Sequence, residues 1–126
     1  MADQPPLALV AGAGAGLGQA LLKRFEAGGF SPVGLGRSRP EAPSGEVHVL
    51  DLSDEASMRT MIAQIIADHG VPTVVVHNAA ELVICPFEDG HLSDYQRTWV
   101  SMVQSCVRLG QSTLQPMVRA GGGAFI

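Results

Sequence analysis

Residues 7–18, LALVAGAGAGLG, join a short apolar run to four glycines at positions 12, 14, 16 and 18. The run Leu7–Ala11 is typical of a buried β-strand, and a helical pattern follows over about residues 17–27. A bare turn between a strand and a helix presents backbone amides at the positive end of the helix, where proteins hold phosphate groups. The stretch therefore predicts a phosphate-binding turn, and the spacing of its glycines indicates which kind.

The glycines fit one spacing fully. The common dinucleotide fingerprint GxGxxG fails from Gly12 or Gly14, because leucine or glutamine stands where the third glycine belongs. The spacing Gly12-xxx-Gly16-x-Gly18 is complete, and no Gly-Lys-Ser/Thr follows, which excludes a P-loop. A glycine-rich turn with no ligand is the alternative. The position between a strand and a helix favours a dinucleotide loop.

Short apolar strands alternate with helical patterns along the rest of the chain. We expect strands at 7–11, 30–36, 47–50 and 73–77, helices at 17–27, 53–70 and 93–119, and the opening of a fifth strand at 124–126. This alternation predicts an α/β fold with a Rossmann-type, doubly wound parallel sheet that breaks off at the start of its fifth strand. Residues 37–46 are too few and too rich in proline to hold a crossover helix, so a loop is expected there.

Two helix starts carry capping signals. Ser53 is expected to cap the second helix, and Ser93–Gln96 matches a capping box for the third. A row of apolar residues with helical spacing follows this box, and we expect it to lie in the core or in an interface. The row consists of Tyr95, Trp99, Met102, Val103, Cys106 and Val107.

Composition excludes several functional classes. Hydrophobic residues make up 46% of the chain and charged residues 16%, which is typical of a globular protein, and the net charge of −4 argues against a nucleic-acid surface. No stretch approaches the roughly 20 apolar residues of a membrane span, and Met1–Pro6 lacks the basic start of a signal peptide. The two cysteines form no CxxC, and the four histidines have no i, i+4 pair that would suggest a metal site. We expect a cytoplasmic protein that binds neither nucleic acid, membrane nor metal.

Three motifs, in this order, resemble the short-chain dehydrogenase/reductase family. They are AGAGAGLG at 11–18, the pair Asp51-Leu52 after the third strand, and HNAA at 77–80 after the fourth. Ala11 stands where the family motif TGxxxGxG has threonine, and Ala80 where NNAG has glycine. The resemblance extends over the whole chain, and it implies a site for a nicotinamide dinucleotide.

The resemblance assigns a role to each matched position. It places Gly12, Gly16, Leu17 and Gly18 at the pyrophosphate and ribose, Asp51 and Leu52 at the adenine, and Asn78 and Ala79, with Ala80 beside them, near the adenine ribose. Asp51 has an alternative role, in which it only starts the turn into the helix cap. Asn78 can also serve as a turn residue at the strand end, and this role is compatible with cofactor binding.

The end of the second strand bears on the choice of cofactor. An NAD site usually places an acidic residue there to bind the ribose 2′-hydroxyl, but this chain has Gly36-Arg37-Ser38-Arg39. The Arg37 guanidinium suits a 2′-phosphate, and Ser38 adds a hydroxyl donor. The sequence therefore favours NADP over NAD.

Catalytic residues of the family do not occur in this chain. The family transfers hydride between nicotinamide and a carbonyl or alcohol, with a tyrosine and a lysine four residues later as the acid–base pair. The chain contains one tyrosine, Tyr95, and one lysine, Lys23, so no Tyr-x-x-x-Lys exists, and Met102 stands at a family asparagine position.

We therefore expect residues 1–126 to be one incomplete domain, the cofactor-binding N-terminal part of an oxidoreductase that binds the dinucleotide without catalysis. A longer parent would act on a small-molecule substrate, and the 93–119 helix would pair copies of the chain. The alternatives are a non-catalytic nucleotide-binding or interaction module and an NADP sensor.

Overall fold

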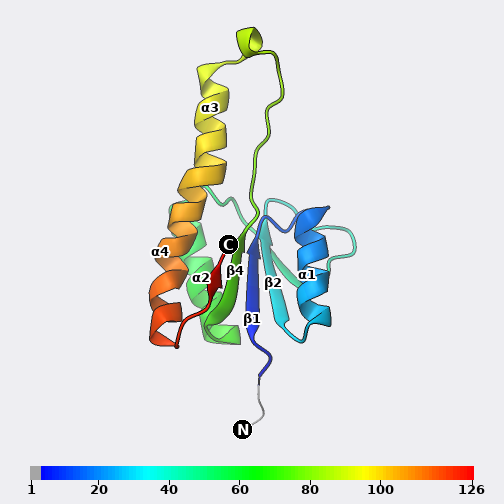
Figure 1. The fold of residues 1–126 in the computed structure, drawn as a ribbon, viewed down its shortest axis with the longest axis vertical. Coiled ribbons are helices and arrows are strands. Elements are labelled where there is room, and N and C mark those ends of the chain that lie inside the picture. Colours follow the sequence, from blue (N-terminus) through cyan, green and yellow to red (C-terminus); the bar gives the residue numbers. More distant parts are fainter. Residues whose placement is uncertain (1–3) are drawn as a thin grey trace.

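A five-stranded parallel sheet with helices on both faces forms the body of the computed structural model (Figure 1). The structure describes residues 4–126; Met1 to Asp3, part of the segment considered above for a signal peptide, lie outside the described residues. The elements are β1 (Leu7–Ala11), α1 (Leu17–Ala27), β2 (Ser31–Gly36), β3 (Glu46–Val49), α2 (Glu55–His69), β4 (Pro72–His77), η1 (Phe87–Asp89), α3 (Leu92–Trp99), η2 (Val100–Gln104), α4 (Ser105–Arg119) and β5 (Ala124–Phe125). The strand order is β3-β2-β1-β4-β5, and the predicted Rossmann-type fold is confirmed.

Alternate residues of the central strands point to the two faces of the sheet. Leu7 and Leu9 of β1 face α2 and α4, where they share a cluster with Ile62 and Leu109. Val10 faces the opposite side, in the cluster that contains residues of α1. Because both faces are covered at the centre of the sheet, β1 is apolar and buried throughout, as expected for a doubly wound sheet.

The order of the strands reverses beside β1, and this point positions the functional site. β1 pairs with β2 on one side and with β4 on the other, so the chain crosses to the far half of the sheet after β3. In sheets of this kind, ligands bind outside the carboxyl ends of the strands at such a switch point. Residues 37–45 contain no helix, as their length and their prolines predicted.

Both predicted helix caps were wrong. Asp54 caps α2, because its carboxylate accepts the amide of Ser57, while Ser53 is occupied by hydrogen bonds to Asp51. Helix α3 begins earlier than predicted, at Leu92, and the Asp94 carboxylate accepts the backbone amide of residue 91, its N-cap. In both places a charged carboxylate, the stronger acceptor, replaces the predicted hydroxyl or amide.

The long helix after β4 is interrupted by the π-helical turn η2, which separates α3 from α4. The apolar row that starts at Tyr95 lies outside the core, with Tyr95 and Trp99 each 55% exposed. The buried side of α4 consists of Ser105, Leu109, Gly110, Thr113 and Met117. A π turn adds a residue to the helical repeat, so the spacing of the row does not continue onto this core face.

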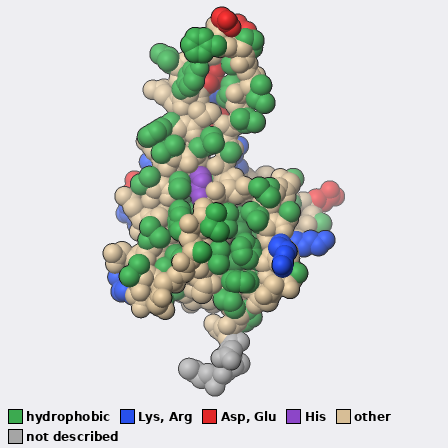
Figure 2. Space-filling view, viewed as in Figure 1, with side chains coloured by type: hydrophobic (Ala, Val, Ile, Leu, Met, Phe, Trp, Pro, Cys, Tyr) green, Lys and Arg blue, Asp and Glu red, His purple; other side chains and the backbone are tan. Residues whose placement is uncertain are grey.

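The α3 helix and the segment that leads to it form an arm beyond the carboxyl ends of the strands (Figure 1). We define the arm as residues 81–104. Apolar side chains lie along it (Figure 2), among them Leu82, Ile84 and Phe87, which are 77%, 85% and 86% exposed. Within residues 4–126, no helix has the length and apolar character needed to cross a bilayer.

Candidate functional site

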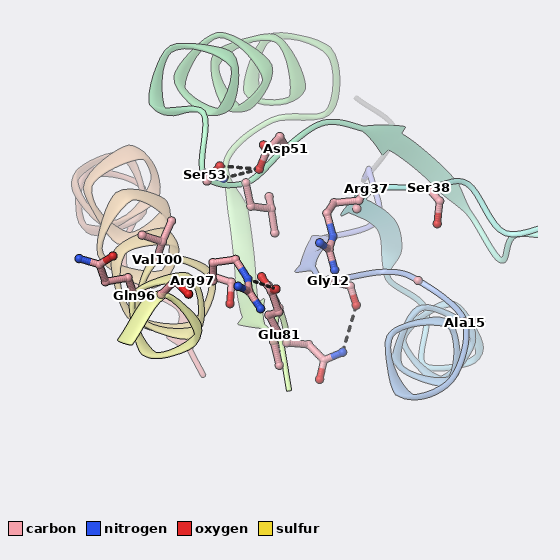
Figure 3. Close-up of a pocket in the computed structure, with 18 residues that line it drawn as sticks. Gly12, Ala15, Arg37, Ser38, Asp51, Ser53, Glu81, Gln96, Arg97 and Val100 are labelled. Carbon is pink, nitrogen blue, oxygen red and sulfur yellow. Dashed lines mark hydrogen bonds and ion pairs between the residues drawn. The ribbon is translucent and has the colours of Figure 1, made fainter. Parts of the chain in front are cut away.

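A groove of about 690 Å³ lies at the carboxyl ends of β1, β2 and β4, between the glycine-rich turn and the arm (Figure 3). Eight of the residues predicted from the sequence line it: Gly12, Arg37, Ser38, Asp51, Leu52, Asn78, Ala79 and Ala80. The other three, Gly16, Leu17 and Gly18, do not line the groove and lie at the start of α1. The groove has the size and concavity of a small-molecule site.

The backbone requires glycine at the positions of the predicted spacing. Gly12 has a φ of 94°, and a Cβ added there would lie 2.5 Å from the backbone nitrogen of Ala79. Gly16 has a φ of 95°, and a Cβ at Gly18 would lie 2.2 Å from the carbonyl oxygen of Gly12. Gly14 has neither constraint. The turn therefore follows the Gly12, Gly16, Gly18 frame.

The glycine turn is fixed to its neighbouring strands by hydrogen bonds. The carbonyl oxygen of Leu35 accepts the amides of both Gly12 and Ala13, each at 2.8 Å. Asn78 donates its side-chain amide to the Gly12 carbonyl oxygen at 3.0 Å and its backbone amide to that of Ala11 at 2.7 Å. Asn78 is thus a strand-end residue that holds the turn in place, the structural role left open by its sequence.

Asp51 uses one carboxylate oxygen to shape the turn before α2. Its Oδ1 accepts the amide of Ser53 at 2.9 Å and the hydroxyl of Ser53 at 2.7 Å. These two bonds hold the pKa of Asp51 below its ordinary value, and the charge of Arg37 adds a smaller effect in the same direction. Asp51 therefore lines the groove as a carboxylate, next to the buried Leu52.

Arg37 and Ser38 follow β2 and are exposed at the groove. In Figure 3, Arg37 lies between Asp51 and Gly12. A side chain that the sequence did not single out braces the loop after them: Gln19 donates to the Ala13 carbonyl oxygen and accepts the amide of Ser44, each at 2.8 Å. No sequence motif marks this brace.

The arm supplies a second wall that no sequence motif predicted. Gln96, Arg97, Val100 and Ser101, together with Glu81, line the groove opposite the glycine turn. The Arg97 guanidinium contacts Glu81 at 2.9 Å and Asp94 at 2.8 Å (the first pair is drawn in Figure 3), and these carboxylates raise the pKa of Arg97. The His91 amide holds the pKa of Asp94 below its ordinary value. The two charged side chains that line this wall, Glu81 and Arg97, therefore offset each other.

The part of the chain that the structure describes contains no set of side chains arranged to bind a metal ion. No three His, Cys, Asp or Glu side chains of residues 4–126 are grouped to hold a metal ion. Tyr95 lies away from the groove, in a separate cavity of about 140 Å³ lined also by Cys85 and Phe87. Lys23 is exposed on α1.

The sequence and fold of the chain are similar to those of known dehydrogenases. The chain is similar to the short chain dehydrogenase/reductase dmxR12 of Cryptosporiopsis sp. (strain 8999), with 36% identity over 75 residues, 58% of this chain and 30% of that protein. The ligand-free aldohexose dehydrogenase AldT of Thermoplasma acidophilum has the same fold, with a TM-score of 0.90 at 19% identity over 97% of this chain and 48% of that one.

A short chain dehydrogenase of Leptospira borgpetersenii with bound NAD⁺ also shares the fold, with a TM-score of 0.87 at 17% identity over 97% of this chain and 50% of that one. The chain thus spans about half the length of these two structures. The family model described as short chain dehydrogenase matches residues 6–126. Because that match covers nearly every residue, the chain belongs to the short chain dehydrogenase family.

Proposed function

We propose that the groove binds a nicotinamide dinucleotide, with NADP preferred over NAD. The observation that carries the proposal is the glycine turn: Gly12 lines the groove with a φ of 94°, and Gly16 follows at the N-cap of α1 with a φ of 95°, with no atom beyond its chain neighbours within 4 Å of the position a Cβ would take. A turn without side chains at the α1 N-terminus would let a pyrophosphate approach the helix amides, which together with the helix dipole would stabilise its charge.

The remaining parts of the dinucleotide fit the groove in the order of the motifs. The Asp51 oxygen that does not bind Ser53 would accept the adenine amino group, beside Leu52. Asn78, Ala79 and Ala80 would pack against the ribose, where small residues leave room. Gly16, Leu17 and Gly18 would contribute backbone amides from the start of α1.

The preference for NADP rests on Arg37 and Ser38. Both are exposed at the groove, where an acidic residue would be needed to select the 2′-hydroxyl of NAD. A guanidinium forms bidentate hydrogen bonds with phosphate, and these are stronger than neutral ones.

Titration of the purified chain with NADPH and NADH, followed by nicotinamide fluorescence, tests both parts of the proposal. Arg37→Asp should shift the affinity ratio toward NADH by at least about tenfold, since it replaces an attraction to the 2′-phosphate by a repulsion. Arg39→Asp is the matched control, because Arg39 is exposed two residues later and does not line the groove. An unchanged ratio in Arg37→Asp would refute the NADP assignment, and no binding of either dinucleotide would refute the site.

For a longer protein that contains this chain, we propose hydride transfer between the nicotinamide and a carbonyl or alcohol of a small molecule. Neither Tyr95 nor Lys23 lines the groove, so the 126-residue chain would bind the dinucleotide and leave catalysis to residues elsewhere. The same observation favours the second candidate, a non-catalytic nucleotide-binding module or NADP sensor. In either case we place the protein in the cytoplasm, and the exposed row on α3 and α4 would pair two copies.

A further inference from the structure

The first residue of the HNAA motif points away from the groove. His77 ends β4, and its backbone amide donates to the Ile126 carbonyl oxygen at 2.8 Å. Its ring is half-buried, does not line the groove, and reaches the long helix, where Nε2 lies 2.7 Å from Oγ of Ser105. Ser105 is fully buried at the first position of α4.

The direction of this hydrogen bond follows from what Ser105 does with its own proton. The Ser105 hydroxyl donates to the carbonyl oxygen of Ser101, one turn earlier. A hydroxyl has one proton, so Oγ can only accept from His77. The neutral ring must therefore carry its proton on Nε2, and burial lowers the pKa of His77, which favours the neutral form.

These contacts connect the two walls of the groove. Ser101 belongs to the π-helical turn η2 and lines the groove on the arm side. Asn78, the residue after His77, binds the carbonyl oxygen of Gly12 on the other side. The chain of contacts thus runs from Ser101 through Ser105 and His77 to the glycine turn.

We propose that His77 is a positioning residue that, through Ser105, holds the π-helical wall at the distance from the glycine turn that a dinucleotide requires. This inference rests on the proposed function of the groove. Histidine suits the position because its Nε2 donor lies one bond further from Cβ than the amide nitrogen of asparagine, the residue of the family motif. Glutamine places an N–H donor at the same number of bonds, so it is the conservative replacement.

Binding of NADPH by five variants, one of them a control, tests the role of His77. His77→Leu and Ser105→Ala should each raise the Kd about tenfold, because each breaks the same buried contact, and the double variant should be little worse than either. His77→Gln should stay within about twofold of the wild type. Thr113→Val is the control for general loss of stability, because the Thr113 hydroxyl makes a comparable buried hydrogen bond, to Leu109, away from the groove. Its Kd should not change.

Nitrogen-15 NMR of His77 and amide exchange over residues 100–105 supply a readout that needs no ligand. We expect the Nε2–H tautomer in the wild type and faster exchange in His77→Leu but not in Thr113→Val. An Nδ1–H tautomer, an unchanged Kd in His77→Leu, or additive effects of the two single variants would overturn the proposal. If the wild type binds neither NADPH nor NADH, the proposed function fails. In that case the tautomer and exchange data still show whether His77 donates to Ser105, but this hydrogen bond has no role in dinucleotide binding.

Discussion

At the scale of single residues, glycines that look equivalent in the sequence have different backbone constraints in the glycine turn. Gly12 and Gly14 both line the groove, yet only Gly12 combines a positive φ with a Cβ position 2.5 Å from the Ala79 nitrogen. Because Gly12 lies against the backbone of Asn78 and Ala79, just after β4, the turn can approach this segment only without a side chain. The fold itself therefore requires glycine at this position.

Paired substitutions test this distinction. Gly12→Ala should lower the free energy of unfolding by at least about 2 kcal/mol, from backbone strain and the clash with the backbone of Asn78 and Ala79. Gly14→Ala should change it by less than about 0.5 kcal/mol, because nothing lies within 4 Å of the added methyl group. Urea denaturation measures both. Equal losses would show that the turn does not have the conformation described.

At the scale of elements, aspartates lie at the starts of α2 and α3. Asp54 starts α2 by accepting the Ser57 amide and hydroxyl, and these bonds hold the pKa of Asp54 below its ordinary value of 3.8. A depressed pKa means that the carboxylate stabilises the folded state above the unfolded pKa, and that this contribution is lost as the pH falls through the folded pKa.

The cap therefore has a specific pH signature. Asp54→Ala should lower the Tm by a few degrees at pH 7, and its difference from the wild type should shrink as the pH falls below about 4. Ser53→Ala, the substitution at the cap that the sequence suggested, should have the smaller effect on the start of α2. Thermal melts followed by circular dichroism at several pH values decide between them. A Ser53→Ala loss larger than that of Asp54→Ala would contradict the observed cap.

At the scale of the whole molecule, the long helix formed by α3, η2 and α4 leaves apolar side chains exposed. Trp99 is 55% exposed and Val107 is also 55% exposed, and both belong to one row along α3 and α4. In soluble proteins, contiguous exposed apolar surface marks interaction sites. This surface supports the proposed pairing of copies through the long helix.

Sedimentation velocity tests the pairing. Trp99→Glu should shift the chain toward the monomer with little change in its Tm, because the Trp99 side chain is 55% exposed and is not one of the buried core residues. Glu88→Gln, at the exposed η1 turn, should leave the association unchanged. If the wild type sediments as a monomer at every concentration, the proposed pairing through this row is wrong.

Features that depend on neighbours in the sequence were predicted well. β1 and α1 have the predicted bounds, and residues 37–45 form a loop, because apolar periodicity, glycine and proline act locally. The cap of α2 was missed because serine and aspartate are both good caps, and only side-chain geometry chooses between them. The pair of Glu81 and Arg97 was missed because tertiary folding brings together residues 16 positions apart.

The brace formed by Gln19 has an evolutionary consequence. Residues 37–45 carry the proposed choice between cofactors, and most of them are exposed, while the Gln19 side chain ties their far end to the glycine turn. Mutations in this loop can accumulate without disturbing the packed sheet, since they remove little buried surface. A few substitutions at exposed positions of this loop would therefore suffice to change the preferred dinucleotide during evolution. Selection for a stable fold would act mainly on other parts of the chain.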